Sequence, residues 1–419
     1  MLLHFKVENF RSYAEAAELS LLRGAKQRAL SDDARVVRCT PNGPDVLRAA
    51  AIFGPNAGGK SNLLKAILML QRAVLRSAAD DDVLPLDVFA TSEFVSKPIH
   101  LEIEFVAGEG HFQYSVEFAL GAVLSESLFR KSVGSRGSPT PLFQRTGNAS
   151  DRAAAIEFSS DLKGHADIDQ WRRNTRPHQL FLSQSQNLSA APFLEDAYSW
   201  FRSKLCFVNT TSDDDAWYTR KRMNDLPFKR RMVNELIAAD LGITEVKVRR
   251  TEFPFAQEVV DGKRVVRTMT APNGLEFVHT PSLGPTFNLD FNDESDGTKY
   301  FFSLLGPLDD VVQNDRILLV DELDRSLHPL LVRRIVRAFS QGISKSQLVF
   351  TTHDATLLDA DVLRRDQVWF AERDAQHRST LRRLATDNVR LDKALMRAYL
   401  DGQFQGVPIT DSQGAFGDE

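Results

Sequence analysis

The stretch that decides the fold is AAAIFGPNAGGKSNLLKAILML, which runs from Ala49 to Leu70. Its centre fits the pattern G-x-x-x-x-G-K-[ST], with Gly54, Gly59, Lys60 and Ser61 at the fixed positions. A short apolar run enters the pattern and a run with helical spacing leaves it, so we expect a strand, a loop and then a helix. Glycines allow a tight turn whose N–H groups face one point, and the helix adds its positive N-terminal end there. The stretch therefore predicts a binding site for a polyphosphate.

The loop pattern also assigns roles to individual residues. Lys60 is expected to reach the β- and γ-phosphates of a nucleotide, and the Ser61 hydroxyl is expected to ligate Mg²⁺. Phosphate contacts are expected along the whole loop, at Asn56, Ala57, Gly58, Gly59, Lys60, Ser61 and Asn62.

The bulk composition allows substantial hydrophobic cores. With 419 residues, of which 42% are hydrophobic, the chain is long enough for two or three domains, or for one large domain with an insertion. A formal net charge of -4 gives no general attraction to nucleic acid or to anionic membranes. Binding to either would therefore need a local basic patch.

Two observations favour a cytoplasmic location. The two cysteines, Cys39 and Cys206, cannot form a disulfide framework, which is typical of a reducing compartment. Residues 1–10 alternate apolar and polar positions instead of forming a signal peptide, and no apolar run reaches the roughly 18 residues of a membrane span. We expect a cytoplasmic protein that has no membrane segment and is not fused to a transporter.

The hydrophobic pattern divides the chain into three parts. Alternating residues predict a strand at 3–10 with a hairpin partner at 19–22, and a second hairpin at 99–106 and 112–120. From about residue 125 to 280 the pattern changes to short strands, loops and helices, which indicates an inserted subdomain. Helices are expected within 171–204 and 226–241, and a meander over 259–278 that turns at Asp261-Gly262 and at Pro272-Asn273-Gly274. The expected domains are 1–124, 125–280 and 281–419.

Two basic clusters lie in the inserted part and could contact a phosphate backbone. The alternative is a solvated or salt-bridged helical face, since Asp213, Asp214 and Asp215 lie beside the second cluster. The first cluster is Arg172, Arg173 and Arg176, and the second is Arg220, Lys221, Arg222, Lys229, Arg230 and Arg231.

A second set of residues completes a nucleotide site. The run ILLVDE predicts a strand buried on both faces, hence a parallel sheet, and it ends in Asp321 and Glu322. Asp321 is expected to hold magnesium through water, and Glu322 to polarise the water that attacks the γ-phosphate. A further apolar strand, LVFTT, ends at His353, with a helix at 329–339 between the two strands. His353 is expected to donate a hydrogen bond to the γ-phosphate.

Residues 294–299 open an apolar helix before this region. Ser295 is placed as its N-cap, and Gly297 would let the phosphate of another molecule approach the helix N-terminus. A simple helix cap is the alternative interpretation of the same segment.

Taken together, these motifs resemble the ATPase heads of the ABC superfamily. The loop, the segment S-x-G-T, ILLVDE, LDRSLHP and TTHD occur in the order of those heads. The opening Asn9-Phe10-Arg11-Ser12 and the run DELDRSLHP are similar to the OLD/RecF/SMC branch, and especially to stand-alone OLD-like bacterial ATP-binding proteins. The resemblance covers residues 1–120 and 280–400. It implies an α/β head with a mixed N-terminal sheet, a parallel P-loop sheet with flanking helices, and an α+β insertion.

The same resemblance implies further site roles. ATP would be the nucleotide, and a head-to-tail homodimer would enclose two ATP molecules, with Ser295 of one subunit meeting the γ-phosphate held by Lys60 of the other. Asp324 would cross that interface, and Arg11 would contact nucleotide. The glutamine that such heads place near the nucleotide could be Gln184 or Gln186.

The resemblance also suggests a biological role. Only residues 354–419 follow His353, and this tail lacks the clustered acids of a Toprim nuclease domain, so we expect no nuclease activity in this chain. Similar ATPases are paired with a separately encoded effector, often an RloB-like or Toprim protein, in antiphage and abortive-infection modules. The first hypothesis is therefore an ATP-driven dimeric switch of such a module. A RecF-like DNA repair ATPase and a non-hydrolysing ATP-gated scaffold are the alternatives.

Overall fold

The structure is a computed structural model that describes most of the chain. The described residues are 1–24, 33–76, 87–119, 121–147, 155–160, 162–163, 166–187, 192–208, 216–260, 263–342, 344–384 and 393–401, so Asp213, Asp214 and Asp215 lie outside them. Contacts divide the chain into two compact units. Unit 1 consists of Met1–Phe207, Val311–Asp324 and Val332–Glu419, and unit 2 of Val208–Asp310 and Arg325–Leu331. The break after Phe207 lies further along the chain than residue 125, where the sequence pattern places the start of the insertion.

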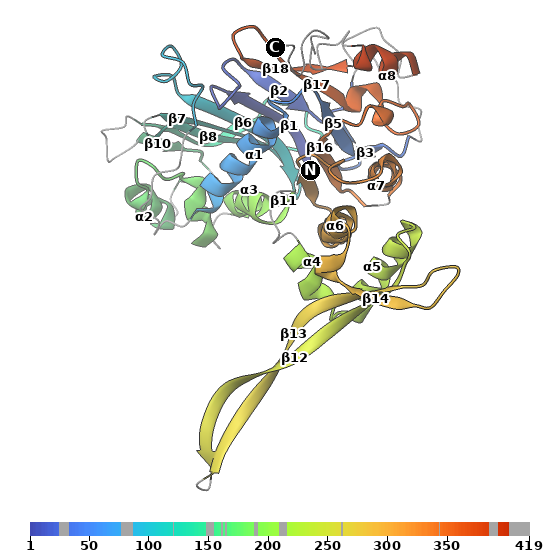
Figure 1. Cartoon of the computed structure of the whole chain (residues 1–419). Coiled ribbons are helices and arrows are strands. Elements are labelled where there is room, and N and C mark those ends of the chain that lie inside the picture. The colour runs from blue at the N-terminus through green and yellow to red at the C-terminus, as the bar shows by residue number, and fades with distance from the viewer. Residues whose placement is uncertain are drawn as a thin grey trace, which may run out of the picture. The chain divides into compact units, whose positions relative to one another are not determined.

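The first sheet of unit 1 has seven antiparallel strands in the order β10-β9-β8-β7-β6-β1-β2 (Figure 1). Burial alternates along β1 and β7 because one face of the sheet packs against the core and the other is solvated. Both predicted hairpins are confirmed, since β1 pairs with β2 and β6 pairs with β7. The strands are β1 (Leu2–Glu8), β2 (Ala17–Ser20), β6 (Ile99–Ala107), β7 (Gly110–Ala119), β8 (Ala122–Ser132), β9 (Thr140–Thr146) and β10 (Ala155–Phe158).

The second sheet of unit 1 has six strands in the order β11-β15-β16-β5-β17-β18. Strands β15, β16, β5 and β17 are parallel, and β18 is antiparallel to β17. Every residue of β5, β15 and β16 is buried, as the apolar runs predict for a sheet covered on both faces. The α/β fold class is therefore confirmed. The strands are β5 (Ala49–Phe53), β11 (Leu205–Val208), β15 (Ile317–Val320), β16 (Gln347–Thr351), β17 (Val368–Arg373) and β18 (Ser379–Arg383).

Unit 1 also contains helices and a small two-stranded sheet. The helix predicted after the loop is α1 (Lys60–Leu75), and the crossover between β15 and β16 carries α7 (Pro329–Gln341). The expectation of helix over 171–204 is only partly correct, because the chain there forms three short pieces. These are α2 (Ala166–Asn174), η1 (Leu182–Asn187) and α3 (Pro192–Ser203). The remaining elements are β3 (Val36–Arg38), β4 (Asp45–Leu47), η4 (Ala355–Leu357), η5 (Arg365–Gln367) and α8 (Lys393–Leu400).

A buried carboxylate ties η1 to the seven-stranded sheet. Glu126 is fully buried and accepts hydrogen bonds from the backbone N–H groups of Phe181 (2.6 Å) and Leu182 (2.9 Å). It also accepts one from the Tyr114 hydroxyl at 2.9 Å, and it lies 3.6 Å from the Arg145 guanidinium. Burial raises the pKa of Glu126, and these donors and the arginine oppose that effect.

Unit 2 is dominated by a long two-stranded ribbon, drawn in yellow in Figure 1. Its strands β12 (Ile243–Val260) and β13 (Lys263–His279) pair from Ile243–His279 to Val260–Lys263, and the turn predicted at residues 261–262 lies outside the described residues. The second predicted turn, Pro272-Asn273-Gly274, is wrong. Arg249 pairs with Gly274 and Arg250 with Pro272, which leaves Asn273 as the extra residue of a β-bulge within β13.

The rest of unit 2 packs around the base of this ribbon. The predicted helix at 226–241 is confirmed as α5 (Leu226–Ala238). Strand β14 (Phe287–Asp290) pairs with the last residues of β13. The other elements are α4 (Ala216–Arg222), η3 (Phe291–Asp293) and α6 (Asp296–Gln313). No helix in the described part of the chain is both long and apolar enough to span a membrane.

Candidate nucleotide site

The glycine-rich loop joins β5 to α1 at the carboxyl end of the parallel sheet. Gly54 and Gly59 have φ angles of 150° and 103°, which favour glycine. A Cβ at Gly54 would lie 2.2 Å from the Ala371 carbonyl oxygen, and one at Gly59 would lie 2.3 Å from Ser379 Oγ. The two glycines are thus required both by backbone conformation and by the close packing of β17 and β18 against the loop.

Lys60 is the first residue of α1 and is almost completely buried, with 6% of its surface exposed. Its Nζ donates hydrogen bonds to the carbonyl oxygens of Gly54 and Pro55, both at 2.9 Å. Burial lowers the pKa of Lys60 to about 8, although the carboxylates of Asp321, Glu322 and Asp324 oppose that effect. Lys60 is therefore protonated at neutral pH and deprotonates more readily than an exposed lysine.

The two predicted magnesium ligands meet directly. Ser61 Oγ donates to Asp321 Oδ1 at 2.9 Å, across 260 residues of sequence. Hard oxygen donors such as a hydroxyl and a carboxylate are the ligands that Mg²⁺ prefers. In the described part of the chain, no group of three or more His, Cys, Asp or Glu residues could hold a metal. The donor set therefore fits a magnesium ion whose remaining ligands come from phosphate and water.

Thr351, at the end of β16, holds the Asp321-Glu322 segment in place. Its Oγ1 donates to Asp321 Oδ1 at 2.7 Å and accepts from the Glu322 N–H at 2.7 Å. Glu322 has a φ angle of 54°, which is uncommon for a residue other than glycine. One buried hydroxyl thus fixes the direction of a carboxylate and supports a strained turn beside it.

His353 follows the same strand, and the fold brings it near the charges of Lys60, Asp321 and Glu322. Its backbone N–H donates to Asp324 Oδ2 at 3.2 Å. Desolvation lowers the pKa of His353 below its ordinary value, and the nearby Lys60 charge contributes in the same direction. At neutral pH the ring is therefore neutral and keeps one N–H donor.

The structure adds residues that the sequence pattern missed. Asn62 Nδ2 donates to Ser12 Oγ at 2.8 Å, and the Ser379 N–H donates to the Ser12 carbonyl at 2.7 Å. Ser379 Oγ is buried beneath Gly59 and has no hydrogen-bond partner among the described residues. Tyr399, on α8, packs on Phe53 with 5.8 Å between ring centroids, and its hydroxyl forms a hydrogen bond with the backbone of Gly54. No motif connects these positions in sequence.

Arg11 and the two glutamines have defined surroundings of their own. Arg11 Nη2 donates to Asp87 Oδ2 at 2.5 Å, and the arginine has a φ angle of 52°. Gln184 is buried in η1, where its Nε2 has no hydrogen-bond partner in the part of the chain that the structure describes. The side chain of Gln186 lies outside the described set.

The segment S-x-G-T, which contains Ser295 and Gly297, lies in unit 2. Ser295 Oγ accepts a hydrogen bond from the Thr298 N–H at 3.1 Å, so the predicted N-cap of α6 is confirmed, and Ser295 itself is exposed. A Cβ at Gly297 would lie 2.6 Å from the Ser326 carbonyl oxygen. The backbone of Ser326 therefore leaves no room for a side chain at position 297, which is a structural reason for glycine there in addition to the predicted phosphate contact.

Fold and site together define a protein of the P-loop ATPase class. A buried parallel sheet presents the loop lysine, the loop serine and a carboxylate at one edge, as nucleotide sites of α/β proteins do. The chain belongs to the family described as "AAA domain, putative AbiEii toxin, Type IV TA system", whose model matches residues 49–359. A search of curated proteins found no relative.

The comparison with solved structures found SMC head domains among its matches. The "SMC head domain from Thermotoga maritima" has a TM-score of 0.41 and 12% identity, and the match covers 91% of this chain and 98% of that one. An Smc head domain from Pyrococcus furiosus, with an extended coiled coil and bound to the C-terminal domain of ScpA, has a TM-score of 0.43 and 14% identity. That match covers 96% of this chain and 99% of the other.

Proposed function

We propose that this protein binds and hydrolyses ATP with magnesium and works as a dimeric switch in a bacterial antiphage defence module, where it controls a separately encoded effector. The observation that supports ATP hydrolysis best is the direct contact of Ser61 with Asp321 beside Lys60. Two separate sequence motifs, the glycine-rich loop and ILLVDE, supply groups to this one place, and each has the chemistry that phosphoryl transfer needs.

Each side chain of the site has its own role in the proposed ATP hydrolysis. Lys60 neutralises phosphate charge, and Ser61 with Asp321 would hold the magnesium ion. Magnesium, when bound, would supply charge neutralisation on the phosphate oxygens. Glu322 orients the attacking water, and the remaining N–H donor of neutral His353 faces the γ-phosphate. Asn56, Ala57, Gly58, Gly59 and Asn62 provide the loop backbone around the phosphates, and Arg11 contacts the nucleotide.

The dimer is supported by the exposed position of Ser295. A residue that meets the γ-phosphate on another subunit must be accessible at the start of its helix, and Ser295 is exposed there. Asp324 would reach across the same interface. Magnesium and ATP would then stabilise the dimer, and hydrolysis would release it.

The biological part of the proposal is supported by the description of the family. That description names a toxin of a type IV toxin–antitoxin system, and such systems consist of more than one encoded component. An effector encoded beside this chain, of the RloB-like or Toprim kind, fits that organisation. The expected result is that phage protection requires both genes and is lost in Lys60→Ala.

The decisive experiment for the switch is the Glu322→Gln variant. We expect ATP turnover to fall at least about 100-fold while ATP binding persists, so that the variant accumulates as a dimer with ATP and magnesium. Size-exclusion chromatography with light scattering measures the dimer, and Lys60→Ala is the control that stays monomeric. Adding Ser295→Glu to the Gln variant should prevent the dimer by placing a carboxylate against phosphate.

The outcome also separates the other two functions. A Glu322→Gln protein that stays monomeric with ATP and retains full turnover would show that the role assignment is wrong. A wild-type protein that forms the ATP dimer without turnover would be the non-hydrolysing scaffold instead. A RecF-like repair function would require affinity for DNA that ATP controls.

A further inference from the structure

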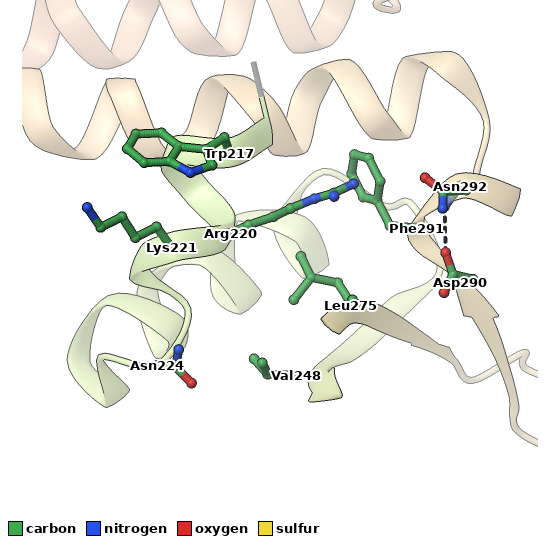
Figure 2. A pocket seen from close by; sticks show the side chains of 10 residues that line it. Trp217, Arg220, Lys221, Asn224, Val248, Leu275, Asp290, Phe291 and Asn292 are labelled. Carbon is green, nitrogen blue, oxygen red and sulfur yellow. Dashed lines mark hydrogen bonds between the residues drawn. The ribbon is translucent and has the colours of Figure 1, made fainter. Parts of the chain in front are cut away.

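Unit 2 contains a cavity that is separate from the loop residues of the nucleotide site. Its volume is about 510 Å³, which lies in the range of pockets that hold small ligands or single nucleotides. The labelled side chains in Figure 2 come from α4 and from β12, β13, β14 and η3, together with Asn224. The lining residues are Trp217, Arg220, Lys221, Asn224, Val248, Gly274, Leu275, Asp290, Phe291 and Asn292.

Two cations and two aromatic rings stand next to one another in this cavity. The Arg220 guanidinium lies over the Phe291 ring at 4.1 Å from its centroid, and Lys221 Nζ lies 4.9 Å from the centroid of Trp217. The Nε atom of Arg220 is buried and has no hydrogen-bond partner in the described ranges of the chain. Stacking on Phe291 holds this guanidinium in one orientation, so its free donors are preorganised for an acceptor.

Nearby basic residues are neutralised, whereas these two cations are not. Arg222 and Arg231 both pair with Asp309, at 3.5 Å and 2.7 Å. Arg249 pairs with Asp290, whose Oδ1 also accepts from the Asn292 N–H. Within the described residues, neither Arg220 nor Lys221 forms an ion pair. The Asp290 carboxylate lines the same cavity and interacts with the Arg220 charge, but within the described residues it forms its ion pair with Arg249. An anion in the cavity would therefore meet two cations that are not held in ion pairs.

Trp217 adds an exposed aromatic side chain to the cavity. Its side chain is on the surface, with 59% of the residue exposed, although tryptophan is strongly apolar. The apolar side chains of Val248 and Leu275 form the opposite wall of the cavity (Figure 2). An exposed indole beside free cations is the arrangement that binds a planar base together with a phosphate.

We propose that this cavity binds a nucleotide unit of a single-stranded nucleic acid, with the base stacked on Trp217 and a phosphate held by Arg220 and Lys221. Asn224 and Asn292 also line the cavity. A duplex does not satisfy the site, because its bases are already stacked and paired. The inference goes beyond the ATP-driven switch and does not depend on it.

The test is binding of a fluorescein-labelled 15-nucleotide oligothymidylate or oligouridylate to the full chain, measured by fluorescence anisotropy without ATP. Trp217→Ala and Arg220→Gln should each weaken binding about tenfold, since base stacking and one charged contact each contribute on that scale. Arg220→Gln should also reduce the salt dependence of log K by about 0.7, the value for one phosphate of a single strand. Trp217→Phe, which keeps an aromatic face, should restore most of the affinity.

Arg230→Gln is the matched control. Arg230 belongs to the same basic cluster and is exposed, but it does not line the cavity. Its replacement should change the affinity less than about twofold, and far-UV circular dichroism should be unchanged for all variants. Equal losses for Arg230→Gln and Arg220→Gln would indicate diffuse electrostatic attraction and overturn the proposal.

Two competitors complete the experiment. Unlabelled duplex of the same length should compete weakly, and thymidine monophosphate should compete only at concentrations far above those of the strand. A duplex that competes as well as the single strand would overturn base stacking. A mononucleotide that competes as well as the strand would reassign the cavity to a free nucleotide, and no binding of any of these would end the proposal.

Discussion

Thr351 is expected to control catalysis without contacting nucleotide, and Thr351→Val tests this. The substitution keeps the branched shape of the side chain, and so its fit in a fully buried strand end, but removes the hydroxyl. The lost contacts are the donation to Asp321 Oδ1 and the acceptance from the Glu322 N–H, both at 2.7 Å. Both carboxylate-bearing residues then lose part of their support.

The magnitude follows from these two contacts. A hydrogen bond to a charged carboxylate contributes about 2 kcal/mol, and one between neutral groups contributes about 1 kcal/mol. The total of about 3 kcal/mol is an upper limit for the loss of positioning, because Ser61 also donates to Asp321. Because these hydrogen bonds position Asp321 and Glu322 in the transition state, their loss should lower ATP turnover between about 10-fold and 100-fold.

The assay is phosphate release at saturating ATP, together with thermal unfolding of each variant. Thr351→Ser retains the hydroxyl and should keep most of the activity. Thr352→Val is the matched control, because Thr352 is equally buried and its Oγ1 accepts only from the Asp354 N–H at 3.0 Å among the contacts described. It should lose about 1 kcal/mol of stability and leave turnover within about twofold of wild type.

Two results would refute this reasoning. The first is a folded Thr351→Val protein with wild-type turnover. The second is an equal loss in Thr352→Val, which would mean that any change at this strand end disturbs the site.

Two further predictions concern buried ionisable groups. Because the pKa of Lys60 is about 8 in the nucleotide-free protein, the cation that ATP requires is lost as pH rises, and ATP affinity measured by calorimetry should weaken about tenfold from pH 7 to pH 9. Lys60→Arg stays protonated and should show a flat profile, whereas an unchanged wild-type affinity up to pH 10 would contradict the assignment. In Glu126→Gln, an amide N–H₂ group replaces one of the two oxygens and so faces the N–H donor of either Phe181 or Leu182, and urea unfolding should show a loss of about 2–4 kcal/mol. Glu117→Gln, which changes a partly exposed contact with Ser125, is the control, and equal losses would exclude a special role for the buried carboxylate.

Much of the nucleotide site was predictable because its chemistry is concentrated in short motifs. The loop from Gly54 to Ser61 needs glycines at fixed spacing, and four consecutive aliphatic residues before Asp321 predict a strand buried on both faces. Adjacent hairpins such as β6 and β7 were predictable for a similar reason, since alternation and a glycine turn are local properties.

The supporting residues could not be predicted, because their contacts are made only in three dimensions. Thr351 reaches Asp321 across 30 residues, and Ser379 lies beneath Gly59 from the far end of the chain. A buried threonine or serine in a strand has no sequence signature of its own. At Pro272-Asn273-Gly274 the sequence predicted a turn that the structure does not contain. These residues form a β-bulge, because the pairing of β13 with β12 continues on both sides of them.

The strand order of the six-stranded sheet also determines when the site can form. Strand β5 is made early, but its neighbours β16 and β17 begin at Gln347 and Val368. At ribosomal speeds of about 5–20 residues per second, β5 waits roughly 15–60 s for its first neighbour. The seven-stranded sheet needs only residues up to Phe158, so it can fold during that interval. The glycine-rich turn is therefore among the first parts synthesised and the last assembled, and a product that ends before Gln347 lacks both strands that pair with β5.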